Sequence, residues 1–196
     1  MKLKQIANIN AGYPFRGKIP EQPGSPVVAV QMKDASPTEG VHWPSCVPTE
    51  LTGKRTPQYL QPGDILVAAR GSRNYATQID HALPPGTQAV AAPHFFVVSL
   101  QQPDILPDYL AWLLNQGPLQ RYFDQNAEGT LTKSIRRSVL EDAPVVIPAL
   151  PRQQAIIQLA NTLRAEQQLI QQLLHNGERM MSSIANDLFD HKDVME

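Results

Sequence analysis

Three polar loops of the sequence carry side chains that can bind an anion. They are AGYPFRGK at Ala11–Lys18, ARGSRNYAT at Ala69–Thr77 and EGTLTKSIRRS at Glu128–Ser138. Lysine, serine and threonine side chains hold phosphate groups, whereas arginine and asparagine can also read the edges of DNA bases. Any one loop is equally well explained by solvation, because surface loops are polar for that reason too. As a DNA-binding set, the candidates are Tyr13, Phe15, Arg16, Lys18, Arg70, Ser72, Arg73, Asn74, Tyr75, Thr132, Lys133, Ser134, Arg136 and Arg137.

Catalytic chemistry, in contrast, has no recognisable constellation in this sequence. There is no P-loop and no glycine-rich dinucleotide motif. Cys46 has no neighbouring base in sequence and is expected to pack rather than to react. The histidines do not stand at ligand spacing from cysteines or paired carboxylates, so we expect no metal site. They are His42, His81, His94, His175 and His191. The sequence therefore favours a binding or assembly protein over an enzyme.

Composition places the chain among soluble globular proteins. Of its 196 residues, 42% are hydrophobic and 18% are charged, which is typical of a packed core rather than of disorder. The single cysteine excludes an intramolecular disulfide. We find no signal-peptide pattern and no apolar run long enough for a membrane span, so we expect a cytoplasmic protein. The formal net charge of −1 argues against a generic nucleic-acid binder, although a neutral body can still carry a local basic face.

Proline and glycine divide the sequence into two regions. All 18 prolines and 10 of the 11 glycines lie at or before Pro151. Short β-branched or aromatic runs bounded by turn residues predict strands in this first region, whereas apolar periodicity predicts helices. We therefore expect an α+β fold, in which a mixed α/β body is followed by a long helix. The expected strands are residues 26–30, 64–69, 94–100 and 143–148, the expected helices are residues 106–116 and 117–126, and residues 19–62 are expected to be largely irregular.

The region from Pro151 to about Asp190 has the pattern of one long coiled-coil helix. Proline in the first turn is a helix start signal, and apolar residues recur at alternating steps of three and four. Glu166 and Gly177 interrupt the seam, and Gly177 leaves open a kink or two shorter helices. Such a helix would be roughly 60 Å long, which exceeds what the body can cover, so a partner helix is expected. The seam consists of Ile156, Leu159, Leu163, Ile170, Leu173, Met180 and Ile184.

Taken in order, these segments resemble the DNA-specificity (S) subunits of type I restriction–modification systems. The resemblance rests on LKQIANINAGYPFRGK at the start and LQPGDILVAARGS in the middle. It continues through PDYLAWLLN and EGTLTKSIRRSVLEDAPVVIPALPRQQAII into the long helix. In that family a recognition domain ends with a glycine-containing loop, a short helix and a strand. A turn flanked by proline then leads into a coiled-coil spacer, commonly through a Glu-Gln pair.

Two departures from the family pattern are visible. The Glu-Gln pair is Arg152-Gln153 here, which puts any contact of that glutamate in doubt. Most S subunits carry two recognition domains and two spacer helices, whereas this sequence has one of each, like a half-length or split S subunit. The resemblance implies a target recognition domain at residues 1–150, a coiled-coil spacer at residues 151–190 and a tail at residues 191–196.

The resemblance also implies a set of partners. Two spacer helices would pair antiparallel through the seam, in a homodimer or with another half-length S chain, and each recognition domain would read half of a bipartite double-stranded DNA target. The methyltransferase (M) subunit would carry S-adenosylmethionine and methylate adenine, so this chain would bind no cofactor and catalyse nothing. A motor–nuclease (R) subunit could join the complex in host defence. Two alternatives stay open: a coiled-coil adaptor that binds protein and not DNA, and a self-contained nuclease.

Overall fold

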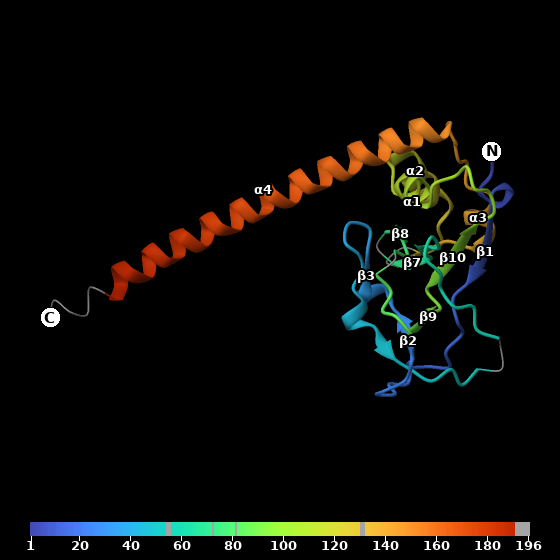
Figure 1. The fold of residues 1–196 in the computed structure, drawn as a ribbon, viewed down its shortest axis with the longest axis horizontal. Helices are drawn as coiled ribbons and strands as arrows, with labels where there is room; N and C mark the ends of the chain where they lie inside the picture. The colour runs from blue at the N-terminus through green and yellow to red at the C-terminus, as the bar shows by residue number, and fades with distance from the viewer. Residues whose placement is uncertain (54–55, 72, 81, 130–131, 191–196) are drawn as a thin grey trace. The chain divides into compact units, whose positions relative to one another are not determined.

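A computed structural model describes residues 1–53, 56–71, 73–80, 82–129 and 132–190 of the chain. The chain divides into two compact units, Met1–Gln154 and Ala155–Glu196. We call the first unit the body, and it includes the first turn of the long C-terminal helix (Figure 1). The second unit is the rest of that helix together with the last residues of the chain.

The main sheet of the body has four antiparallel strands in the order β1-β10-β6-β8. The central strand β6 is buried along its whole length, because each of its four residues is apolar and neither face meets solvent. The register sets Ile9 opposite Val98 and Val98 opposite Ile65. The expected strands at 64–69 and 94–100 are thereby confirmed. The bounds are β1 Ala7–Ala11, β10 Phe95–Leu100, β6 Ile65–Ala68 and β8 Ala76–Gln78.

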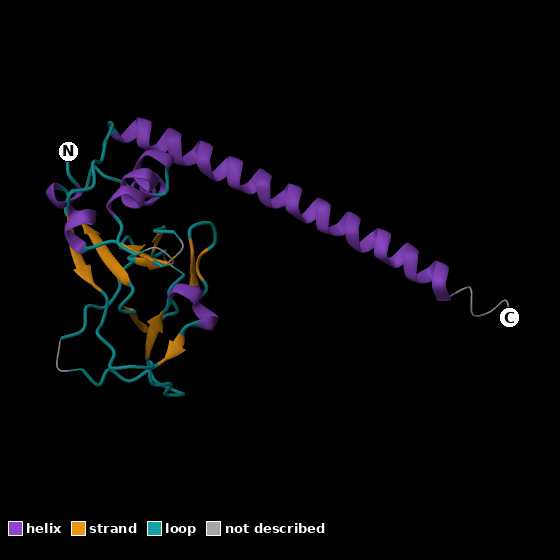
Figure 2. Cartoon of the chain, turned by 180° about the vertical axis from the view of Figure 1, so that it is seen from behind, coloured by secondary structure: helices purple, strands orange, loops and turns teal. Residues whose placement is uncertain are grey.

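A second sheet joins β2 to a parallel neighbour, β9, and to an antiparallel one, β5. The expected strand at 26–30 is confirmed as β2. The expected irregular region contains only short elements, and loops make up much of this part of the body (Figure 2). Its elements and those of the second sheet are β2 Val27–Val30, η2 Met32–Asp34, β3 Ala35–Ser36, β4 Gly40–Val41, η3 Trp43–Ser45, β5 Val47–Pro48 and β9 Gln88–Ala91.

Helices α1 (Pro107–Leu114) and α2 (Gly117–Asn126) contact one another and confirm the two expected helices. Proline lies in the first turn of each, where its missing N–H costs no hydrogen bond. Their apolar faces join the larger core, in which Leu110, Leu114 and Phe123 are almost completely buried. The 3₁₀ helix η1 (Leu3–Gln5) and helix α3 (Arg137–Glu141) also contribute to this core.

The strand expected at residues 143–148 does not form, so that prediction was wrong. One isolated bridge joins Pro144 to Lys2. Around it, the Leu3 N–H donates to the Ala143 carbonyl at 3.0 Å, and the Val145 N–H donates to the Met1 carbonyl at 2.9 Å. Proline lacks the N–H that a longer ladder needs, so Pro144 and Pro148 limit pairing to this short contact.

Helix α4 (Leu150–Asp190) has 41 residues and is continuous through Gly177. The break that glycine left open therefore does not occur. Ile156 is half-buried, but the other six residues of the predicted seam are exposed, from 46% for Ile184 to 71% for Leu173. None of the helices in the described residues is long and apolar enough to cross a membrane.

Candidate nucleic-acid interface

Two of the three polar loops are joined by a small sheet. Strand β7 (Arg70–Gly71) pairs antiparallel with β11 (Lys133–Ser134), so that Arg70 faces Ser134. The Ile135 N–H extends this contact by donating to the Ala69 carbonyl at 2.9 Å. Two loops that lie about 60 residues apart in the sequence therefore form one surface. We call it the β7–β11 surface. It comprises the described residues of 69–77 and 128–138.

Glycine is required where the second loop turns back. Gly129 has a φ of +92°, and a Cβ at this position would lie 2.5 Å from the Thr132 carbonyl oxygen. Residues with side chains rarely adopt such a φ, and the contact is shorter than any real one. Beside it, Glu128 and Ser134 exchange two backbone hydrogen bonds, of 2.8 and 2.9 Å. This backbone pairing lies next to Lys133 in β11.

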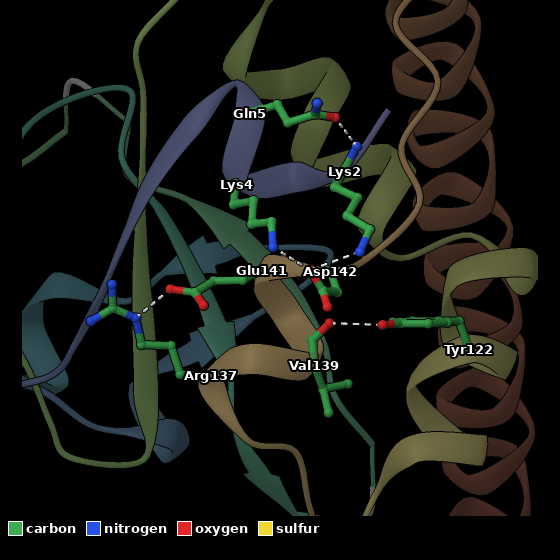
Figure 3. A network of polar contacts seen from close by, with 8 residues as sticks. All are labelled: Lys2, Lys4, Gln5, Tyr122, Arg137, Val139, Glu141 and Asp142. Carbon is green, nitrogen blue, oxygen red and sulfur yellow. Dashed lines mark hydrogen bonds and ion pairs between the residues drawn. The ribbon is translucent and has the colours of Figure 1, made fainter.

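Most cations of the β7–β11 surface form exposed ion pairs with neighbouring carboxylates. Lys133 meets Asp124 at 2.6 Å, and Arg136 meets Glu128 at 2.6 Å. The side chain of Arg70 has no hydrogen-bond or ion-pair partner among the described residues. Exposed pairs contribute little stability, because water screens them, so a phosphate group could replace a carboxylate at small cost. Arg137 pairs with Glu141 at 2.7 Å (Figure 3).

Arg73 ties the first of these loops to the helices. Its Nε donates to Gln120 Oε1 at 3.2 Å, and its terminal nitrogen donates to the Asn115 carbonyl at 3.3 Å. Asn115 also bonds the backbone of Ala76 at both its N–H and its carbonyl. The side chains of Asn115 and Gln120 therefore hold this loop from α1 and α2, a role that sequence reasoning missed because glutamine and asparagine at helix ends carry no local signal.

Asn74 is buried in the body, and Tyr75 beside it is partly buried. Asn74 is 3% exposed and donates to the Ala68 carbonyl at 2.8 Å. The Tyr75 hydroxyl lies 3.1 and 3.0 Å from the carbonyls of Met32 and Ala35. Burial raises the pKa of Tyr75 to about 12, because the phenolate would lose its hydration. In this structure both side chains support the loop from beneath, and Ser72 lies outside the described residues.

The third loop, which follows β1, is built differently. Tyr13 is buried, its hydroxyl accepts a hydrogen bond from the Gly53 N–H at 2.7 Å, and its ring contacts the ring of Phe15 edge-on. Arg16 and Lys18 are exposed. The loop leaves the same end of the sheet as the loop after β6, because Ala11 pairs with Phe96 and Ala68 with Phe95. It does not take part in the β7–β11 pair.

A cluster at the start of the chain was also missed by sequence reasoning. The ammonium groups of Lys2 and Lys4 meet the same carboxylate oxygen of Asp142, at 3.2 and 2.8 Å (Figure 3). The hydrogen bond from Lys4, with a second from Lys2, lowers the pKa of Asp142 and correspondingly raises that of Lys4. The cluster connects η1 to the end of α3. No sequence signal indicates that residues 2 and 142 are neighbours.

Catalytic geometry does not emerge from the described residues. They contain no group of three or more histidine, cysteine or acidic side chains that could hold a metal ion. Cys46 is buried, and burial raises its pKa to about 12, so the thiol is not a thiolate near neutral pH. The arrangement can bind through exposed cations and hydroxyl groups.

Comparisons with solved structures show which fold this is. The S subunit of the type I restriction–modification system from M. genitalium matches 83% of this chain with a TM-score of 0.52 and 14% identity. The HsdS subunit from Thermoanaerobacter tengcongensis matches 85% with a TM-score of 0.56 and 13% identity. A chain from a structure on the assembly and conformational transition of the type I R-M system matches 84%, with a TM-score of 0.56 and 14% identity.

The chain has the fold of a type I S subunit. It spans 37% of the length of each of these structures. No family model matches the sequence, and no curated protein does either. At 13 to 14% identity the likeness is one of fold, and it does not show which residues form a binding site.

Proposed function

We propose that this chain is the DNA sequence-recognition subunit of a type I restriction–modification complex. The observation that carries the proposal is the fold match to S subunits over 83 to 85% of the chain. The body would read one half of a bipartite double-stranded DNA target, and helix α4 would pair with a second spacer helix. The chain would be non-catalytic, and S-adenosylmethionine would be bound by the M subunit that methylates adenine.

The proposed DNA contacts centre on the β7–β11 surface. Its cations come from two loops held together by backbone pairing, so they can meet one duplex at the same time. The Arg70 side chain has no partner among the described residues and is the first candidate for a phosphate or base contact. We propose Arg16 and Lys18 as a second group of DNA contacts. The loop that carries them leaves the main sheet at the same end as the loop after β6. Phe15, Thr132 and Ser134 are candidates beside these cations.

A coiled-coil adaptor that binds protein remains the second candidate function. Two observations favour it: the net charge is −1, and the cations of Lys133, Arg136 and Arg137 are already neutralised by carboxylates. An adaptor would use the same exposed seam of α4 and would show no response to DNA.

Reconstitution with an M subunit tests the proposal. The chain is co-purified with an adenine methyltransferase (M) subunit of a type I system, and a random double-stranded DNA library is incubated with the complex and labelled S-adenosylmethionine. We expect methylation of a bipartite sequence that requires both proteins. Affinity for the recovered site should also fall steeply with salt, since phosphate contacts release counterions. Binding that is absent, or indifferent to salt, would favour the adaptor. The matched control is the same complex with Arg70 and Arg136 replaced by alanine.

A further inference from the structure

Arg73 differs from the paired cations of the β7–β11 surface in the groups that hold it. Those cations meet carboxylates at 2.6 or 2.7 Å. The guanidinium of Arg73 instead donates to two neutral oxygens, Gln120 Oε1 at 3.2 Å and the Asn115 carbonyl at 3.3 Å. Amide oxygens carry no formal charge, so they orient the guanidinium without cancelling its charge. The positive charge of Arg73 therefore remains available to an anion.

The two hydrogen bonds of Arg73 occupy one edge of its guanidinium. A guanidinium carries five N–H groups in one plane. The two acceptors take the N–H of Nε and one N–H of Nη2. Both N–H groups of Nη1 and the second one of Nη2 have no partner among the described residues. The free end of the fork matches a pair of acceptors, such as guanine O6 and N7 or two oxygens of a phosphate group.

The amide of Gln120 is itself fixed in one orientation. Its Nε2 donates to the Asn74 carbonyl at 2.6 Å and to the Leu114 carbonyl at 2.8 Å. Two carbonyl acceptors identify that end of the amide as the nitrogen, so Oε1 is the end that faces Arg73. Gln120 lies in the first turn of α2, and Phe123 of the same helix is buried in the larger core. The acceptor is therefore anchored by a helix that is packed on the body.

The second acceptor of Arg73 is also tied to the main sheet. The side chain of Asn115 accepts from the Ala76 N–H at 2.9 Å and donates to the Ala76 carbonyl at 2.7 Å. Strand β8 is an edge of that sheet, so the amide satisfies backbone groups that a further strand would otherwise pair. The carbonyl that receives Arg73 belongs to this same residue, and its position is fixed with it.

Ordering an arginine before it binds changes the cost of its contact. The side chain has many rotamers, and immobilising it on a ligand costs conformational entropy. Arg73 is exposed, yet its guanidinium already has two partners within the body. Preorganisation of this kind raises affinity and makes the contact directional.

We propose that Gln120 is a positioning residue for DNA recognition, which holds the Arg73 guanidinium so that its free end meets a pair of acceptors on the duplex. This inference deepens the proposed function and rests on it. Arg73 touches the DNA, whereas Gln120 acts on the DNA only through Arg73. The acceptors belong to a guanine edge in the major groove or to a phosphate group, since both present the same geometry to the fork.

A double-mutant cycle tests whether Gln120 acts through Arg73. Gln120→Leu, Arg73→Ala and the double variant are each reconstituted with the M subunit, and their dissociation constants for the recovered duplex are measured. We expect Gln120→Leu to weaken binding about ten-fold in the wild-type background, because an oriented bidentate contact is lost. Beside Arg73→Ala the same substitution should weaken binding less than about two-fold. Equal losses in both backgrounds would mean that Gln120 only supports the loop, and no loss in the wild-type background would also overturn the proposal.

Two further variants separate orientation from folding. Gln125→Leu, at an exposed position of α2, is the matched control and should leave the dissociation constant unchanged. Arg73→Lys keeps the charge but replaces the planar fork by a point charge. It should keep the salt slope and still lose affinity about ten-fold. Wild-type affinity in Arg73→Lys would show that charge alone matters, and it would overturn the proposal even if Gln120→Leu failed to fold.

The sequences that the variant complexes methylate distinguish the two kinds of acceptor. For Gln120→Leu, a guanine contact predicts a relaxed preference at one position of the half-site, whereas a phosphate contact predicts a uniform loss across sequences. A wild-type complex that binds no DNA would remove the proposed function together with this inference. Binding by the wild type without coupling in the cycle would remove this inference alone.

Discussion

The Oε1 atom of Gln153 accepts a hydrogen bond from the Leu106 N–H at 2.9 Å, and both residues lie within the body. Gln153 is completely buried although it stands in the first turn of α4. Its Nε2 donates to the Asp104 carbonyl at 2.9 Å and to the Pro148 carbonyl at 2.8 Å. One amide therefore satisfies three backbone groups and fixes the start of α4 to the segment before α1.

Replacing Gln153 with leucine should destabilise the body. Leucine has a similar size but removes three partly buried hydrogen bonds to one N–H and two carbonyls, each of which contributes about 0.5–1.5 kcal/mol. We expect a loss of about 2–4 kcal/mol in the free energy of unfolding, measured by urea denaturation. Gln154→Leu is the matched control, because the side chain of Gln154 is exposed. Equal losses for both variants would contradict the role of the buried amide.

Asp142 should make the stability of the body sensitive to acid. Its pKa is lowered by Lys4 and Lys2 in the folded state, so it stabilises the fold at pH values above its unfolded pKa. That contribution disappears as the pH falls below 3.8 through the lower folded pKa. Asp142→Asn should be less stable than the wild type at pH 7, and the difference should shrink towards pH 2. Thermal unfolding across that range measures it, and a constant difference would disprove the linkage.

Arg136→Ala should weaken DNA binding without unfolding the protein. The side chain is exposed and paired only with Glu128, so stability should change little. Losing one phosphate contact should reduce the slope of log affinity against log salt by about one unit. Fluorescence anisotropy with a labelled duplex measures the slope at several salt concentrations.

The control for this measurement is Arg164→Ala, which removes the same charge from α4. It should leave the slope unchanged, because the proposed DNA contacts lie on the β7–β11 surface. Arg73→Ala should also weaken binding. If both Arg73→Ala and Arg136→Ala fold and keep the wild-type slope, these loops do not contact DNA.

Replacing Leu163 and Ile170 with glutamate should produce monomers whose body still folds. Both side chains are at least half exposed in the single chain. A charge at these positions should therefore weaken the pairing of helices and leave the core of the body intact. Light scattering measures the mass, and circular dichroism checks the fold. Replacing Gln171 and Gln172 with glutamate adds the same charge outside the seam and should leave the dimer intact. A double seam variant that stays dimeric would place the interface on another face of α4.

Periodic elements of this fold could be predicted from the sequence, because their signals are local. Strands β6 and β10 are apolar runs between turn residues, and α1, α2 and α4 begin near prolines. The segment at 143–148 has the composition of a strand, but its prolines lack the N–H groups that a ladder needs, and it forms only one bridge, to Lys2. Composition alone does not report whether a partner strand is present.

The candidate site was predictable in its residue types and not in its geometry. Exposed cations such as Arg70 and Arg136 follow from polar loops. The inward positions of buried Asn74 and partly buried Tyr75 depend on the carbonyls of Ala68, Met32 and Ala35, which only the folded backbone brings near. The pairing of β7 with β11 is likewise a long-range contact without a local signal.

The absence of a break at Gly177 has a consequence for the evolution of DNA targets. In an antiparallel pair of continuous helices, the gap between the two helix starts depends on the number of heptads alone. Adding one heptad to the gene would widen this gap by about 10 Å, or about three base pairs of B-DNA. Under the proposed function, duplication or deletion of seven codons would thus change the length of the unread DNA segment while both recognised half-sequences stay the same.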